Sequence, residues 1–208
     1  MIKNIGKKAL EGIADAIIDN FKKNEDEIND MNVFPVPDGD TGTNMLLTLK
    51  AIKEEVLKTK NPTIKAVLES ASLGALMGAR GNSGVILSQI VKGFFDILIR
   101  SEKVDLEIIR QALKSSREVA YNAVQDPTEG TMLTTIKDMH IHVEEICENS
   151  NNDIKLRELL DSIIRAAEES VERTTSGCIT FSTFVPLFFM TISFLLDFNK
   201  SQYRPKRQ

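Results

Sequence analysis

Asp38-Gly39-Asp40-Thr41-Gly42-Thr43-Asn44 joins a loop of acidic residues and glycines to a stretch with helical periodicity. After this loop, apolar residues recur every three or four positions, the spacing that places them on one face of an α-helix. The residues of that face are Met45, Leu46, Leu49, Ile52 and Val56. We expect a helix at residues 43–59, with ends good to about two to four residues.

The same period runs through most of the chain, and strand alternation bounded by turns is absent from the sequence. Short connections such as Lys60-Asn61-Pro62 indicate that consecutive helices are antiparallel neighbours. The sequence therefore predicts an all-α fold. The other expected helices lie at 2–29, 63–77, 83–100, 104–123, 131–148 and 153–173.

Composition narrows the class of protein. The chain has 208 residues and a formal net charge of −4, which argues against a nucleic-acid partner because phosphate backbones attract basic surfaces. Cys147 and Cys178 are too few for a disulfide framework. Charged residues at Lys7, Lys8 and Glu11 interrupt any apolar leader near the N-terminus. The expected location is the cytoplasm.

The first loop has the composition of a metal site. Asp38 and Asp40 stand two positions apart around Gly39, and carboxylates that share a site repel unless a cation lies between them. Magnesium is typically held by one or two carboxylates together with substrate phosphates. The simpler alternative is a turn rich in Asp that only caps a helix.

A phosphate site is expected beside this metal site. Thr41, Thr43 and Asn44 open the helix, and the free N–H groups of a first turn attract anions. Gly39 and Gly42 permit positive φ and a close approach of phosphate to the backbone. A calcium EF-hand is excluded, because its spacing would require glycine at Thr43 and glutamate at Leu49.

Two further loops are candidates. Gly78-Ala79-Arg80-Gly81-Asn82-Ser83-Gly84 has glycines three apart, with Asn82 or Ser83 able to cap the next helix. Arg80 is a candidate for stabilising a transferring phosphoryl group. The alternative is a glycine-rich turn between helices with a solvated arginine, and the residues alone favour neither. Glu129-Gly130-Thr131-Met132-Leu133, taken alone, is better explained as an ordinary helix start.

Together, the three loops resemble a known family. The stretch from Asn32 to Met45 resembles the signature of the ATP-binding subunit of bacterial fatty acid kinase. Residues 78–89 resemble its second motif, and residues 120–124 followed by 129–131 resemble its third. The N-terminal domain of that subunit is similar to the nucleotide-binding L subunit of dihydroxyacetone kinase. The resemblance covers roughly residues 1–173.

The resemblance implies an antiparallel barrel of about seven or eight helices with ATP and two Mg²⁺ ions at one end. Asp38 and Asp40 would be metal ligands, and Asn32 is a candidate third ligand because Val33 occupies the position of the third aspartate in the dihydroxyacetone kinases. The residues implied to lie near the phosphates or the nucleotide are Thr41, Thr43, Asn44, Asn82, Ser83, Gly84, Gly130, Thr131 and Met132.

The end of the chain departs from the family, which continues with a glycine-rich segment and further domains. We therefore expect a nucleotide-binding domain at 1–175 and an apolar tail at 176–208, of which residues 178–196 carry no formal charge. We favour a poorly formed last helix over the open side of the barrel. A membrane anchor is the alternative, although Pro186 and several hydroxyl residues count against it.

The implied function is phosphoryl transfer from ATP to a fatty acid carboxylate that a separate fatty-acid-binding protein holds, giving an acyl phosphate. A dihydroxyacetone-type kinase subunit is the alternative enzyme. A nucleotide-binding module without turnover is the alternative outside enzymes, since the partner-binding domains are missing. A homodimer is left open.

Overall fold

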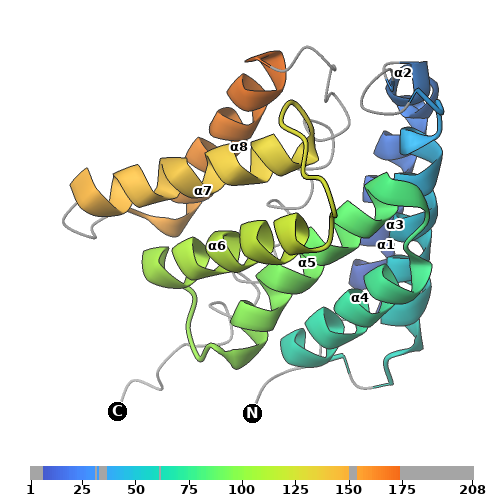
Figure 1. Cartoon of the computed structure of the whole chain (residues 1–208). Helices are drawn as coiled ribbons and strands as arrows, with labels where there is room; N and C mark the ends of the chain where they lie inside the picture. Colours follow the sequence, from blue (N-terminus) through green and yellow to red (C-terminus); the bar gives the residue numbers. More distant parts are fainter. Residues whose placement is uncertain (1–6, 31, 33–36, 61, 150–153, 174–208) are drawn as a thin grey trace.

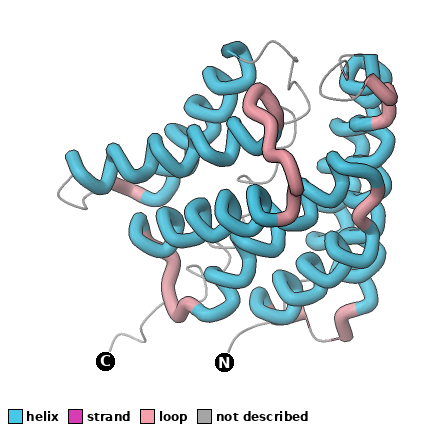
Figure 2. Tube along the Cα trace, in the orientation of Figure 1, coloured by secondary structure: helices cyan, strands magenta, loops and turns pink. Residues whose placement is uncertain are grey.

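The structure, a computed structural model, describes residues 7–30, 32, 37–60, 62–149 and 154–173. Within these ranges the chain forms eight α-helices and no strand (Figure 2), which confirms the predicted all-α class. The helices are α1 (Lys7–Lys23), α2 (Glu25–Asp30), α3 (Thr41–Lys58), α4 (Ile64–Gly78), α5 (Gly81–Arg100), α6 (Leu106–Asn122), α7 (Met132–Asn149) and α8 (Leu156–Arg173).

The helix bounds from α3 to α8 agree closely with the predicted ranges, but the single helix expected at 2–29 is wrong. Asn24 divides it into α1 and α2. The Asn24 amide group donates to the Asn20 carbonyl at 2.9 Å, and its backbone N–H turns back to the Phe21 carbonyl at 3.1 Å. An asparagine side chain that competes with the backbone in this way ends a helix turn, which periodicity alone does not reveal.

Consecutive helices are packed neighbours (Figure 1), and the longer connections are those before α3 and before α7. Helix α3 packs against α1, α2, α4 and α5, and a row of pairs continues from α5 through α6 and α7 to α8. No extensive packing joins α8 back to α1 within the described residues. Because the neighbours alternate in direction, the starts of α3, α5 and α7 lie toward one end of the array.

Helix α5 forms the centre of this arrangement, with contacts to α3, α4, α6 and α7. It is long and apolar enough to cross a membrane, but 56% of its most apolar window is buried inside the protein, as in the core helix of a globular domain. At Gly93 an added Cβ would lie 2.7 Å from the Ser116 Cα atom, so glycine allows α6 to approach closely. The proposed tail, 176–208, and its segment 178–196 lie outside the described residues.

Candidate functional site

The beginning of α3 carries the two aspartates of the first loop. Gly39, between them, has φ of +64°, a left-handed conformation that favours glycine, as the sequence predicted. The Asn32 amide nitrogen donates to a carboxylate oxygen of Asp38. Asp40 is the N-cap residue of α3, yet its carboxylate makes no capping hydrogen bond. The structure therefore brings Asn32 to Asp38 and leaves the Asp40 carboxylate uncommitted.

The first turn of α3 is capped by a residue of another helix, α2. The Asn29 side-chain oxygen, from α2, accepts from the N–H of Gly42 at 2.8 Å and from the N–H of Thr43 at 3.2 Å. The expectation that these N–H groups are free for an anion is therefore wrong. The Thr43 hydroxyl donates to the Glu25 carboxylate at 2.9 Å, so it too is bonded to α2.

Gly42 has a different role from the one expected. It lies within α3, and an added Cβ would stand 2.7 Å from the Glu25 carbonyl oxygen and 3.1 Å from the Ile28 Cγ2 atom. The missing side chain at Gly42 therefore makes room for α2 rather than for a phosphate. That close approach is what lets Asn29 reach the helix start.

The first and second loops are in contact. An added Cβ at Gly81, which has φ of +55°, would lie 2.2 Å from the Asn44 amide nitrogen. At Gly84, one turn later, a Cβ would lie 2.7 Å from the Thr48 hydroxyl. Glycines at these positions allow the starts of α3 and α5 to pack side by side, and Asn44 becomes a buried residue between them.

The start of α5 offers what the start of α3 does not. No hydrogen bond among the described residues satisfies the N–H groups of Gly81, Asn82 and Ser83, and the N-cap residue Arg80 provides no side-chain cap. The Ser83 hydroxyl is buried without a hydrogen-bond partner in the described part of the chain. Because buried polar groups are normally bonded, these donors suit an anion.

Arg80 lies at the junction of α4 and α5. Its guanidinium donates to the carbonyl of Ala79 at 2.9 Å and lies 3.5 Å from the carbonyl of Met77, at the end of α4. A cation is favourable at a helix C-terminus, where carbonyl groups are unpaired. In this conformation Arg80 stabilises the turn, and its role in phosphoryl transfer stays a prediction.

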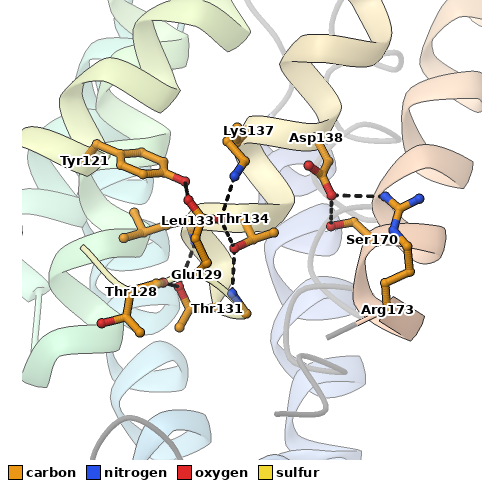
Figure 3. A network of polar contacts seen from close by, with 11 residues as sticks. Tyr121, Thr128, Glu129, Thr131, Leu133, Thr134, Lys137, Asp138, Ser170 and Arg173 are labelled. Carbon is orange, nitrogen blue, oxygen red and sulfur yellow. Dashed lines mark hydrogen bonds and ion pairs between the residues drawn. The ribbon is translucent and has the colours of Figure 1, made fainter. Parts of the chain in front are cut away.

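The third loop is fixed by Glu129 (Figure 3). The Glu129 carboxylate accepts from the Tyr121 hydroxyl at 3.0 Å, the Thr134 hydroxyl at 2.6 Å and the Lys137 ammonium at 2.6 Å. Lys137 lowers the pKa of Glu129, and burial together with Glu129 raises the pKa of Tyr121. Glu129 therefore stays charged and joins the end of α6 to the beginning of α7.

Within this loop the backbone is also tied down. Gly130 has φ of +81°, and its N–H donates to the Thr134 hydroxyl at 2.7 Å. The Thr131 hydroxyl donates to the Thr128 carbonyl at 2.8 Å and accepts from the N–H of Leu133 at 3.3 Å. These bonds cap the start of α7 from within the same loop. The first residue of α7, Met132, is buried. The predicted proximity of Gly130, Thr131 and Met132 to a nucleotide stays a prediction.

Asn29 and Glu129 hold the first and third loops in place, and local sequence does not reveal this role for either residue. Asn29 looks like one more polar residue of a helix, since its partners lie 13 and 14 residues further on. Glu129 was visible only as part of an ordinary helix start. In both cases the signal lies in contacts between elements and not in local spacing.

The candidate metal-ligand groups of the first loop suit a hard cation. They are two carboxylates and one amide, all on the segment that precedes α3, and oxygen ligands are those that Mg²⁺ prefers. No group of three or more His, Cys, Asp or Glu side chains in the described residues forms a metal cluster. A magnesium ion bound by two carboxylates would complete its coordination with water and phosphate oxygens, so the residues fit an ion that arrives with a nucleotide.

Comparison with known proteins identifies the domain. The sequence profile of the DAK2 domain matches residues 35–179. Uncharacterised proteins of Staphylococcus aureus strains USA300, NCTC 8325 and Mu50 are each 41% identical over 177 residues. These matches cover 84% of this chain but only 31% of each relative, so the chain spans less than a third of their length. The chain belongs to the DAK2-domain family, a nucleotide-binding family related to the L subunit of dihydroxyacetone kinase.

Proposed function

We propose that this chain is the nucleotide-binding part of a kinase that transfers phosphate from Mg-ATP to a fatty acid carboxylate presented by a partner protein. One observation carries the proposal. The uncommitted Asp40 carboxylate and the uncapped start of α5 belong to two loops that are held together by the contact between Asn44 and Gly81. A cation site thus adjoins an anion site, the combination that a metal-bound polyphosphate requires.

Each loop would have a distinct task. Asp38 and Asp40 would hold Mg²⁺, with Asn32 oriented by its contact with Asp38. The N–H groups of Asn82 and Ser83 and the buried Ser83 hydroxyl would donate to phosphate oxygens. Mg²⁺ would supply charge neutralisation on the phosphates, and the protein would contribute position and electrostatic stabilisation with little covalent chemistry.

The acceptor follows from the family resemblance and not from a described contact. A carboxylate acceptor attacks the terminal phosphorus, the bond to the leaving ADP oxygen breaks, and an acyl phosphate and ADP result. Arg80 would stabilise the transferring group after leaving the carbonyls of α4, to which it is bonded here. The relatives are longer than this chain, since the match covers 31% of each.

Two measurements test the proposal. Titration calorimetry of ATP into the purified chain, with Mg²⁺ or with chelator, should give clearly tighter binding with the metal. The Asp38→Asn and Asp40→Asn variants should lose that difference. Asp161→Asn is the matched control, because Asp161 is an exposed carboxylate on α8 with the same charge change.

Phosphoryl transfer is then assayed with a fatty acid, with and without its carrier protein, and separately with dihydroxyacetone. Metal-dependent ATP binding without transfer to either acceptor would indicate a nucleotide-binding module and not a kinase. Transfer to dihydroxyacetone alone would show that the acceptor is dihydroxyacetone and not a fatty acid. Absence of metal-dependent ATP binding would refute the proposal altogether.

A further inference from the structure

The capping of α3 differs from that of α4 and α6, whose N-cap residues carry a side-chain oxygen. At α6 the N-cap Asp105 accepts from the N–H of Ile108 at 3.1 Å with its own carboxylate, and at α4 Thr63 accepts from the N–H of Ala66 at 3.2 Å. This is the ordinary arrangement, in which the N-cap side chain bonds the second or third N–H of its helix.

Asp40 occupies the same position at α3 without making that bond. The second and third residues of α3 are Gly42 and Thr43, and both N–H groups are bonded to the Asn29 side-chain oxygen. The bonds that the Asp40 carboxylate would ordinarily make are therefore already made by a residue of another helix. Nothing in the first turn of α3 holds the Asp40 carboxylate in place.

Asn29 is itself held firmly. Its amide nitrogen donates to the Thr43 hydroxyl at 3.1 Å, and that hydroxyl donates onward to Glu25. The carbonyl of Asn29 accepts from the N–H of Asn32 at 3.1 Å, and the Asn32 side chain contacts Asp38. One asparagine thus contacts the segments on both sides of the aspartate loop.

We propose that Asn29 is a positioning residue that caps α3 in place of Asp40 and so frees the Asp40 carboxylate for the divalent cation. The inference rests on the proposed function, because it presumes that Asp40 binds the metal of Mg-ATP. It explains why an aspartate, a preferred cap residue, stands at a helix start without capping it. It also explains why the phosphates would be bound by α5, since the N–H groups of Gly42 and Thr43 in α3 are occupied.

Removal of the Asn29 side chain has a specific consequence. In Asn29→Ala the N–H groups of Gly42 and Thr43 lose their partner, and Asp40 can accept from them once its backbone turns from φ −120° and ψ 4° to the extended conformation of Thr63 and Asp105. The Asp40 carboxylate would then be withdrawn from the cation. Mutation of a residue that positions a metal ligand without binding the metal typically weakens metal binding about 10- to 100-fold. The stability without ligand should change little, because one cap replaces another.

The experiment compares variants by calorimetry of ATP with Mg²⁺ and with chelator, and by urea unfolding without ligand. Asn29→Ala should weaken Mg-ATP binding about 10- to 100-fold and leave ATP binding with chelator nearly unchanged. Asn29→Asp keeps an acceptor for both N–H groups and should bind Mg-ATP nearly as well as the parent. Asn24→Ala is the control, since the Asn24 side chain also bonds the backbone in this segment, but its partner is the Asn20 carbonyl of α1 and not an N–H group of α3.

A double variant keeps the test decisive if Asn29→Ala loses stability. If Asn29 acts through Asp40, adding Asn29→Ala to Asp40→Asn should cost little further Mg-ATP affinity, because contacts on one path are not additive. Equal Mg-ATP affinity in Asn29→Ala and the parent, an equal loss with and without metal, or full additivity would each overturn the inference. In those cases the parent still shows metal-dependent binding, whereas a parent without it refutes the proposed function as well.

Discussion

Gly81 and Gly130 form a matched pair for testing the contact between the first two loops. Both residues have positive φ, +55° and +81°, so alanine is strained at either position. Their surroundings differ, because a Cβ at Gly130 meets nothing within 4 Å, whereas one at Gly81 would lie 2.2 Å from the amide nitrogen of Asn44. The difference between the two alanine variants therefore measures the packing of Asn44 against the second loop.

The expected losses of unfolding free energy follow from two effects, backbone strain at positive φ and the steric clash with Asn44. Left-handed backbone costs an L-residue about 1–2 kcal/mol, which is the whole effect expected for Gly130→Ala. In Gly81→Ala the buried Asn44 side chain must also move, and overpacking of a close-packed site adds about 1–3 kcal/mol. We expect a loss of about 2–5 kcal/mol for Gly81→Ala, with Mg-ATP affinity reduced as well because Asn44 is displaced from the candidate site.

Urea unfolding followed by circular dichroism at 222 nm gives the free energies of both variants. A third protein, Gly81→Ala with Asn44→Ala, removes the clash and should recover the steric part while the backbone strain remains. If Gly81→Ala and Gly130→Ala lose equal free energy, or if the Asn44 change recovers nothing, the first and second loops do not meet as described.

Other predictions address the ligands and one buried histidine. Asp38→Ala and Asp40→Ala should each abolish ATP turnover while the helical circular dichroism stays nearly unchanged, because both side chains lie on a loop and not in the core; full activity in either would exclude the metal assignment. Mg-ATP should raise the melting temperature much more than ATP with chelator, since a ligand at a hundred times its Kd adds ~2.7 kcal/mol. Arg80→Lys should bind ATP like the parent but transfer phosphate more slowly, as it loses the planar guanidinium, and equal turnover would contradict this. Burial lowers the pKa of His140 despite the nearby Glu144 carboxylate, so the neutral form is favoured in the fold. The resulting stability is complete above the unfolded pKa of about 6.5 and is lost as pH falls below it. The free energy of unfolding measured with urea should therefore decrease from pH 7.5 to pH 5.5 in the parent, and should decrease less in His140→Gln.

The helices were largely predictable because their burial is periodic. The face that begins with Met45 and Leu46 is buried in α3, and the corresponding residues of α6 include Ile109 and Leu113, which are fully buried. A 3.6-residue period is a local property of the chain, so it is visible without the structure. The helix break at Asn24 could not be predicted from periodicity, because it depends on one side-chain bond and leaves the apolar period intact on both sides.

The candidate site can be proposed from the sequence, but the hydrogen bonds that its residues make in the fold cannot. Spacing placed Asp38 and Asp40 at one loop and pointed to the glycines of the second loop. It did not show that the N–H groups of Gly42 and Thr43 belong to Asn29, because that bond crosses between helices. Side-chain contacts between elements depend on packing, and packing is the part of a fold that a single sequence expresses least directly.

The glycines of the second loop illustrate how packing and binding depend on each other. Their spacing of three is equally consistent with a phosphate cradle and with a plain turn between helices. In the structure a Cβ at Gly78 would lie 2.1 Å from the Ala51 Cβ atom, one at Gly81 would strike Asn44 and one at Gly84 would strike Thr48. All three are therefore required for α3 to approach the end of α4 and the beginning of α5. That approach brings the aspartate loop beside the unpaired N–H groups of α5. The same glycines thus shape the candidate site by bringing two helix starts together.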